Sequence, residues 1–305
     1  MVGNQGNDII TGGAGSDNAN GGAGNDTITT AGANDTITAG AGNDNIDAGA
    51  ADDSIVMGAN FTFDDVIDGG ANGTGGDTLS ANALGTNGDI NFLNSSNIEN
   101  LVLGAGASQI GSRAQAAGVT AVTMIPGAGV DTLTATTYTT GLTVTAGIGN
   151  DSISLGSGND NIVVDSNDEI DVNDTIAFGS GSDTITTTAV AGTANGVSLD
   201  LDNITGLETI VLGASAAAGV DVSTIQFLAV TATTSQTITI DGSSATGATD
   251  NITVTNASAR ATTAFDITTG AGADSVQGGS GADTIATNGN GDSVNANQGN
   301  DSVNT

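Results

Sequence analysis

The sequence predicts an all-β fold, namely a parallel β-solenoid or β-roll with glycine- and aspartate-rich loops, interrupted by irregular β segments. Three observations support this prediction. The chain repeats with a period of nine residues, it contains 48 glycines but only six Phe and one Tyr among 305 residues, and its formal net charge is −32. A solenoid needs only a narrow core of small stacked side chains, so the shortage of aromatic residues fits this fold.

Residues 1–56 carry the repeat in its most regular form. A small or branched apolar residue lies two positions after each repeated Asp, and a Gly or Ala lies two positions before it. The unit has the form G-G-x-G-x-D-x-U-x, where U is apolar, and it is most complete in Gly21-Gly22-Ala23-Gly24-Asn25-Asp26-Thr27-Ile28-Thr29. The aspartates of this block lie nine residues apart, at Asp8, Asp17, Asp26, Asp35, Asp44 and Asp53.

Each unit divides into a short strand and a glycine-rich turn. In the segment that begins at Asp26, β-branched residues surround one inward apolar position, Ile28, which is the alternation typical of a strand. Glycines reach positive φ without steric cost, so the loop can turn tightly and direct its carbonyl groups inward. The Asp adds an anionic oxygen to these neutral oxygens, which suits Ca²⁺ with its six to eight oxygen ligands. We therefore expect calcium-binding Gly/Asp loops.

This unit resembles the RTX nonapeptide, a calcium-binding repeat of parallel β-rolls. The resemblance implies that two nonapeptides form one coil and that loops two units apart share an ion. One edge would then align Asp8, Asp26 and Asp44, and the other would align Asp17, Asp35 and Asp53. The candidate ligands are the aspartates of all recognisable units: those of residues 1–56 above, Asp131, Asp151, Asp160, Asp174 and Asp183 in the middle of the chain, and Asp274, Asp283, Asp292 and Asp301 near its end.

The composition excludes several classes of function. The chain has 34 acidic residues and two basic ones, Arg113 and Arg260, so nucleic acids and anionic membrane surfaces are not expected as electrostatic partners. It has no Cys and no His, which removes disulfides, zinc and iron–sulfur sites and His-dependent catalysis. No apolar run approaches the roughly 20 residues of a membrane span, and no Sec-type signal is visible. The same composition would allow disorder, which we expect when calcium is absent.

The repeats divide the chain into five blocks. Repeat blocks are predicted at 1–56, 126–186 and 269–305, and β segments at 57–125 and 187–268. The two β segments contain a similar sequence. It reads Asn97-Ile98-Glu99-Asn100-Leu101-Val102-Leu103-Gly104 in the first segment, and residues 203–213 of the second contain Leu207-Glu208-Thr209-Ile210-Val211-Leu212-Gly213. This long-range duplication favours one continuous structure over separate domains.

Two interruptions carry interpretations of their own. The stretch 57–68 holds the densest aromatic cluster, with Phe61 and Phe63, and is expected to form a bulge or plug over the core. The acidic stretch 165–171 interrupts the middle block with Asp165, Asp168, Glu169 and Asp171, and it is either an additional ion site or a solvated loop, of which the loop is preferred.

No catalytic motif accompanies the repeats, so the chain is not expected to be an enzyme. A zinc protease requires H-E-x-x-H and a lipase requires G-x-S-x-G, and neither occurs. Recurrent Thr-x-Thr steps could form an ice-binding ladder, but outward threonines are also what strand propensity supplies.

The β segments resemble those of RTX-type surface-layer proteins and large RTX adhesins. This resemblance implies type I secretion, an extracellular or cell-surface location, and folding when the chain meets calcium outside the cell. The expected function is calcium-dependent self-assembly into a head-to-tail filament or surface-layer array. The rival is a stiff stalk or adhesin segment of a larger RTX protein. The expected partner is a second copy of the chain, joined through its terminal repeats, and a cell-surface polysaccharide is a further candidate.

Overall fold

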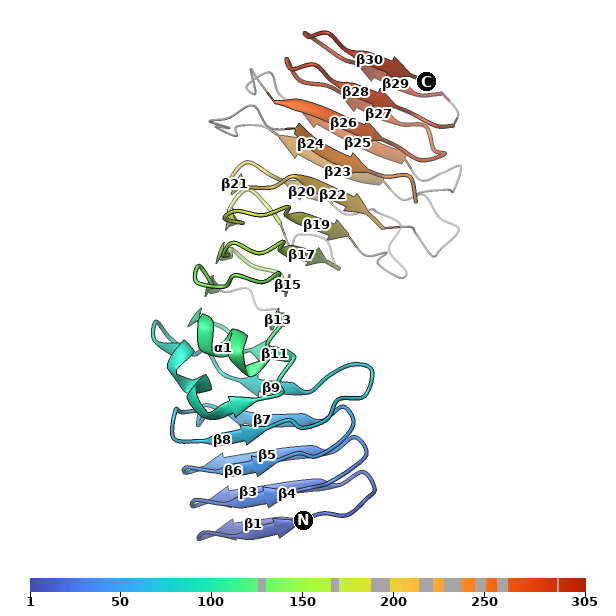
Figure 1. The fold of residues 1–305 in the computed structure, drawn as a ribbon. Helices are drawn as coiled ribbons and strands as arrows, with labels where there is room; N and C mark the ends of the chain where they lie inside the picture. The colour runs from blue at the N-terminus through green and yellow to red at the C-terminus, as the bar shows by residue number, and fades with distance from the viewer. Residues whose placement is uncertain are drawn as a thin grey trace. The chain divides into compact units, whose positions relative to one another are not determined.

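The computed structural model describes residues 1–125, 130–165, 170–187, 198–213, 222–227, 237–244, 251–256, 263–289 and 291–305. The described chain is a parallel β-solenoid with little helix, which confirms the predicted fold class. Contacts divide it into two compact units, one made of residues 1–125 and 131–144 and the other of residues 126–130 and 145–305 (Figure 1). The division of the sequence into five blocks stays a prediction.

In the first unit, each coil contributes one strand to a long sheet and another to a facing sheet. The long sheet runs through β1 (Val2–Gln5), β3 (Asn18–Ala23), β5 (Thr36–Ala41), β7 (Ser54–Gly58), β9 (Thr78–Ala81), β11 (Asn100–Leu103) and β13 (Ala121–Met124). The facing sheet contains β2 (Ile9–Thr11), β4 (Thr27–Thr29), β6 (Asn45–Asp47), β8 (Val66–Asp68) and β10 (Ser95–Ser96), and a further pair is formed by β12 (Ala107–Gln109) and β14 (Thr132–Thr134).

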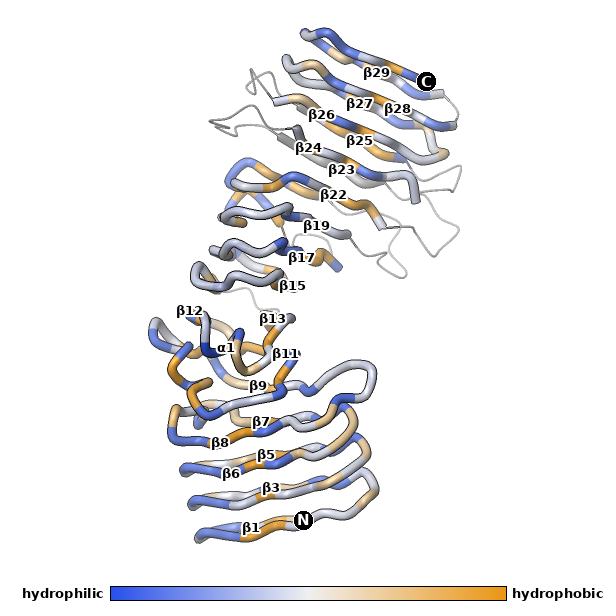
Figure 2. Tube along the Cα trace, in the orientation of Figure 1, coloured by the Kyte–Doolittle hydropathy of each residue, from blue (hydrophilic) through white to orange (hydrophobic). Residues whose placement is uncertain are grey.

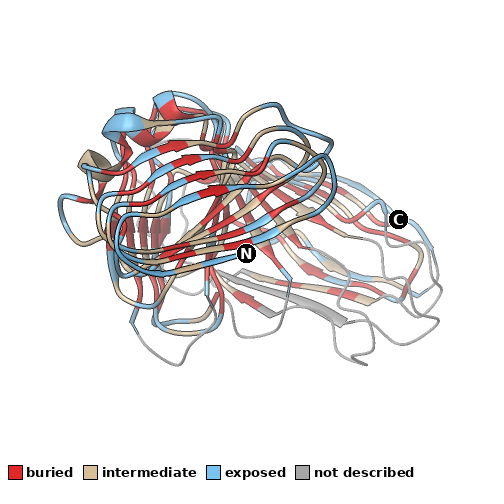
Figure 3. Ribbon diagram, turned by 90° about the horizontal axis from the view of Figure 1, so that it is seen from below, coloured by how far each residue is buried: buried red, intermediate tan, exposed pale blue. Residues whose placement is uncertain are grey.

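The nine-residue period produces this stack because two units make one coil. Ile28 pairs in register with Ile46, and Ile37 pairs with Ile55, so equivalent side chains lie directly above one another. All four are at most 1% exposed, and Figure 3 shows buried residues alternating with less buried ones along the strands of the inner coils. Burial of each such side chain stabilises the fold by about 1.5–3 kcal/mol. In Figure 2, hydrophobic and hydrophilic segments alternate along each coil.

The aromatic cluster forms a bulge, as expected, between β7 and β8. Phe61 is buried and packs edge-to-face against Phe92, with ring centroids 5.1 Å apart, whereas Phe63 is half exposed. The side chains of Asn91 and Asn94 donate hydrogen bonds to the carbonyl oxygens of Phe61 and Phe63. The insertion therefore lengthens one coil and is fastened to the coil that follows.

Two short helices were not expected from the sequence. The 3-10 helix η1 (Gly88–Asn94) and the α-helix α1 (Ser112–Ala117) both interrupt coils of the first unit. Helix α1 ends at Gly118, whose φ of 109° is the left-handed conformation that favours glycine. Residues 57–125 are predicted from the sequence as a β segment with an insertion and with no mention of a helix, although the alanine-rich sequence of α1 favours a helical turn.

The second unit repeats the two-strand coil. Its long sheet contains β17 (Asn161–Val164), β19 (Thr184–Thr187), β22 (Thr209–Leu212), β24 (Thr237–Asp241), β26 (Ala264–Thr268), β28 (Thr284–Ala286) and β30 (Ser302–Asn304). Its other strands are β16 (Ser152–Ser154), β18 (Thr175–Ala177) and β21 (Ile204–Thr205), and then β20 (Ser198–Asp200), β23 (Val222–Phe227), β25 (Asn251–Asn256), β27 (Ser275–Gln277) and β29 (Ser293–Asn295). Strand β15 (Thr143–Thr145) lies where the chain passes between the units.

Some sequence predictions fall on positions outside the described residues. These include Asp168 and Glu169 of the acidic stretch, the first glycines of the unit that contains Asp131, and several stretches of the β segment predicted at 187–268. Among the described residues, no helix has the length and apolar character that a bilayer span requires.

Candidate metal sites

Every predicted ligand occupies the same position in the fold, the residue immediately before a strand. Those in inner coils are buried, with exposed fractions of at most 3%, whereas the predicted ligands in the outermost coils are half-buried. The inner set comprises Asp26, Asp35, Asp44, Asp53, Asp131, Asp151, Asp160, Asp174, Asp183, Asp274 and Asp283. The outer set comprises Asp8, Asp17, Asp292 and Asp301. The structure therefore places all of them at equivalent turns.

Hydrogen bonds join these residues into columns that run along each unit. The backbone N–H of Asp8 donates to Oδ1 of Asp26 at 2.8 Å, and the N–H of Asp26 donates to Oδ1 of Asp44 at 2.9 Å. On the other edge, Asp17 and Asp35 donate in the same way to Asp35 and Asp53, at 2.6 and 2.7 Å. The alignment that the sequence predicted for the two edges is thus confirmed.

The second unit contains shorter columns built in the same way. The pairs are Asp151 with Asp174 (2.6 Å), Asp160 with Asp183 (2.8 Å), Asp274 with Asp292 (3.0 Å) and Asp283 with Asp301 (3.0 Å). Asp131, in the first unit, accepts instead from the N–H of Gly106 at 2.5 Å. In each case one carboxylate oxygen is used by the neighbouring coil.

The second carboxylate oxygen is the one that suits a cation. Oδ2 is buried and has no hydrogen-bond partner in Asp8, Asp26, Asp35, Asp44, Asp53, Asp77 and Asp183. At Gly21 the space that a side chain would occupy is bounded by Oδ2 of Asp26 and the carbonyl oxygen of Ala39, so two acceptors converge there without a donor. A buried carboxylate without a partner is costly, and a divalent cation would satisfy both oxygens.

The glycine loops stack so closely that no side chain fits between them. A Cβ on Gly40, whose φ is +109°, would collide with the carbonyl oxygen of Gly22 in the preceding coil, and one on Gly42 would collide with that of Gly24. The carbonyl groups of one loop therefore point along the stack toward the next loop. Among the described residues, no three acidic side chains gather at one point, so a cation held here would take most of its ligands from these carbonyl oxygens.

Burial changes the acidity of several column residues. Removal from water, with neighbouring carboxylates adding to it, raises the pKa of Asp53, Asp77 and Asp183 to about 6 from an ordinary value of 3.8. Burial also raises the pKa of Asp44 and Asp274. The columns thus hold their negative charge poorly without a compensating cation. Calcium bound there would neutralise the column and cross-link successive coils.

The sequence prediction omitted four residues that the structure adds to the columns. Asp44 donates to Oδ1 of Asp65 at 2.8 Å, and Asp53 donates to Oδ1 of Asp77 at 2.7 Å. Two columns then continue to a glutamate, one to Glu99 and the other to Glu208. The signal for the two aspartates was present, because each is followed two positions later by a buried apolar residue, but the coils of 21 and 24 residues break the nine-residue step.

An asparagine ladder runs beside the carboxylates. Oδ1 of Asn25 accepts the N–H of Asn43 at 3.0 Å, and Oδ1 of Asn7 accepts the N–H of Asn25 at 2.9 Å. These side chains are exposed and still join successive coils. Asn159 and Asn251 do the same in the second unit.

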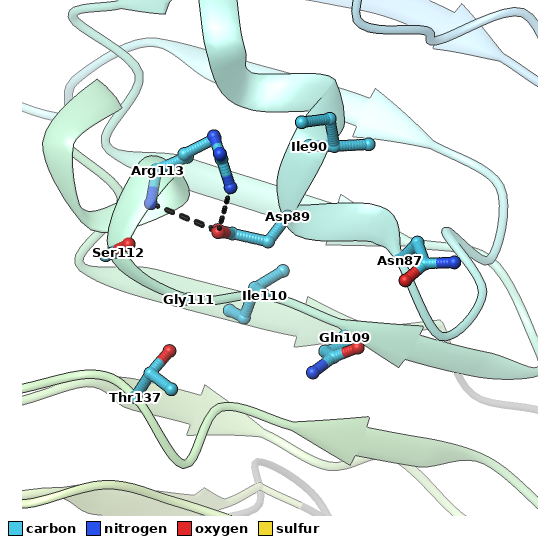
Figure 4. Close-up of a pocket in the computed structure, with 9 residues that line it drawn as sticks. All are labelled: Asn87, Asp89, Ile90, Gln109, Ile110, Gly111, Ser112, Arg113 and Thr137. Carbon is cyan, nitrogen blue, oxygen red and sulfur yellow. Dashed lines mark hydrogen bonds and ion pairs between the residues drawn. The ribbon is translucent and has the colours of Figure 1, made fainter.

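A separate pocket of about 590 Å³ lies in the first unit and contains none of the column residues. Arg113 and Asp89 face each other across it with a contact of 3.5 Å (Figure 4). Asp89 also accepts the N–H groups of Arg113 and Ala114 at the start of helix α1. The Asp89 carboxylate is therefore used within the fold to hold this helix in place.

Comparison with known families decides the nature of the repeats. A family model, the RTX calcium-binding nonapeptide repeat (4 copies), matches residues 1–28, 29–59, 143–168 and 268–303. The chain contains RTX calcium-binding nonapeptide repeats. Its RTX repeats contain most of the carboxylate columns described above, and calcium is the cation that fits them. No curated protein was found to match the sequence.

Proposed function

We propose that this RTX protein is an extracellular structural protein that folds on binding calcium and then assembles with further copies end to end. RTX repeats bind calcium, and the proteins that carry them are typically secreted. The observation that carries the proposal is the series of buried carboxylate columns, because their charge opposes folding in the absence of a cation. The proposed role is structural and requires no catalysis.

Calcium dependence follows from the charge that the columns bring together. The five-membered column from Asp17 to Glu99 places carboxylates in successive coils with only backbone donors between them. Neighbouring strands lie about 4.8 Å apart, so these charges are close. The chain offers only two basic residues against 34 acidic ones, so its own side chains supply almost no compensation. Calcium ions outside the cell would supply the compensating positive charge instead.

Assembly is supported by the complementary outer coils. Within a column, each carboxylate accepts an N–H from the coil before it. Asp8 and Asp17 are the first residues of their columns, so their carboxylates receive no N–H from an earlier coil. Asp292 and Asp301 are the last residues of theirs, so their N–H groups have no carboxylate of a later coil to bind. The core is also open at this last coil, since Val303 is 46% exposed while Ile285, its partner in the preceding coil, is 1% exposed. A first coil stacked on a last coil would pair these groups, and such a contact repeats without closing.

Light scattering in calcium tests the proposal. The chain at rising concentration in millimolar calcium is expected to give particles that lengthen, and chelation should dissolve them. Replacement of Asp8 and Asp301 together by Asn should leave a folded monomer, whereas the control replacement of the exposed Asp47 and Asp266, with the same change in charge, should still assemble. A parent chain that stays monomeric in millimolar calcium would reject self-assembly and favour the stalk of a larger protein.

A further inference from the structure

Two of the three glutamates in the chain occupy one recurrent position. The N–H of Asp77 donates to Oε2 of Glu99 at 2.9 Å, and the N–H of Asp183 donates to Oε2 of Glu208 at 2.7 Å. Inside the repeats the equivalent acceptor is always the Asp of the next coil. Glutamate is thus used where a column leaves the repeats and enters an irregular β segment, once in each compact unit.

The backbone around these glutamates is also the same. Glu99 is preceded by buried Ile98 and by Asn97 at φ 54°, and Glu208 is preceded by buried Leu207 and by Gly206 at φ 78°. Each glutamate is followed by a strand in parallel register with the previous coil, β11 on β9 and β22 on β19. The turn of left-handed residue, buried apolar residue and glutamate therefore occurs twice, independently, in one chain.

The length of the turn explains why glutamate is needed. Between β8 and β9 the chain spends nine residues, 69–77, on a glycine loop that ends in Asp77, whereas between β10 and β11 it has only residues 97–99. The second unit shows the same contrast, with residues 178–183 before β19 and residues 206–208 before β22. In both units the short turn carries glutamate in place of aspartate, and the additional methylene gives its carboxylate a longer reach toward the preceding coil.

The Asp whose N–H each glutamate accepts also carries a buried carboxylate oxygen that has no partner. Asp77 and Asp183 are both 0% exposed, and Oδ2 of each lacks a hydrogen-bond partner. The space beside Gly69 is bounded by Oδ2 of Asp77 and the carbonyl oxygen of Asn97, the same combination of acceptors that surrounds Gly21 within the repeats. The turn that carries Glu99 thus supplies a carbonyl oxygen beside Oδ2 of Asp77 and a carboxylate that accepts the N–H of Asp77.

We propose that Asp77 with Glu99, and Asp183 with Glu208, each bind a calcium ion that fastens an irregular β segment to the last glycine loop of a repeat column. These two sites lie outside the nonapeptides, since the second carboxylate of each comes from a turn without a glycine loop. The proposal rests on calcium binding by the repeats and is independent of self-assembly.

Glutamine substitution separates this proposal from a purely structural role. Glu99→Gln and Glu208→Gln keep an oxygen that accepts the N–H of the preceding Asp, but they lose the charge that binds a cation. Native mass spectrometry of the full chain in saturating calcium should show one calcium ion fewer for each variant and two fewer for the double variant. Asp47→Asn removes the same charge from an exposed residue and should leave the number of bound calcium ions unchanged.

Hydrogen exchange provides a second measurement. Loss of the ion should speed exchange at least tenfold in β11 of Glu99→Gln and in β22 of Glu208→Gln, while β3 and β5 stay protected. The two sites lie in different units, so one variant gives a result even where the other fails to fold. Folded variants that bind as many ions as the parent would overturn the proposal. A parent chain that binds no calcium would refute the proposed function instead. Self-assembly is judged separately, by light scattering alone.

Discussion

Replacement of Asp26 by Ala tests the column assignment most directly, because two neighbouring coils depend on this residue. Its Oδ1 accepts the N–H of Asp8, its own N–H reaches Asp44, and its Oδ2 is buried without a partner. Loss of the charged acceptor alone should cost about 1.5–3 kcal/mol. Loss of the metal ligand should cost more, because Asp26 lies between two loop pairs and would serve two ions.

The contribution of calcium to stability can be separated from that of the hydrogen bond because only the former depends on the free calcium concentration. A bound ion stabilises the folded state by about 2.7 kcal/mol per site when free calcium is 100 times the dissociation constant. Two lost sites would therefore cost about 5 kcal/mol, and the deficit should grow by about 1.4 kcal/mol per site for each tenfold rise in calcium. The hydrogen-bond contribution should not change with calcium.

Hydrogen exchange of the amides in β2, β4 and β6 at several calcium concentrations measures this local stability. Asn25→Ala is the matched control in the same loop. It removes the acceptor for the N–H of Asn43, so it should cost about 0.5–1.5 kcal/mol at every calcium concentration. If the deficit of Asp26→Ala were equally insensitive to calcium, the carboxylate column would not be the calcium site.

Three further predictions follow from the same geometry. Chelation should convert the β circular dichroism signal to that of a coil, and Ca²⁺ should restore it far better than Mg²⁺, which demands a tighter octahedral site; an unchanged signal would contradict the calcium assignment. Because Asp53, Asp77 and Asp183 have a pKa of about 6 when folded and lower when unfolded, the calcium-free coil should gain β dichroism as the pH falls from 7 to 5, while calcium affinity falls over the same range; calcium-free dichroism that does not rise on acidification would refute this reasoning. Gly40→Ala should destabilise the first unit by more than about 2 kcal/mol, since its Cβ would meet the stacked carbonyl group at positive φ, whereas Gly13→Ala, with open space around it, should be nearly neutral in a urea titration, and equal effects would argue against close stacking of the loops.

The sequence predicted the columns well where the coil length is constant. Two nonapeptides make one coil, so a residue such as Asp26 is placed by counting alone, and its inward neighbour Ile28 follows from strand alternation. Counting failed where coils are longer. Asp65 and Asp77 were missed because insertions shift them by three and six residues from the 18-residue spacing, although both precede strands like all the others.

The glutamates show a different limit of sequence reasoning. The similar sequences around Glu99 and Glu208 are visible in the chain, but the role of the two glutamates depends on which loop lies in the previous coil. That neighbour is 22 to 25 residues away and is fixed only by stacking. Helix α1 was missed for a related reason, because its six residues favour a helix locally while the composition of the whole chain favours strands.

The Phe61 bulge has a consequence for how the stack finds its correct order. Identical coils can pair one coil out of place, since every Asp and Ile would still meet an equivalent residue. A coil of unequal length removes this ambiguity, because only one alignment brings Phe61 against Phe92 and Asp65 above Asp44. The irregular coil therefore fixes the register of the stack, so that calcium stabilises one arrangement of the repeats rather than several arrangements shifted by one coil.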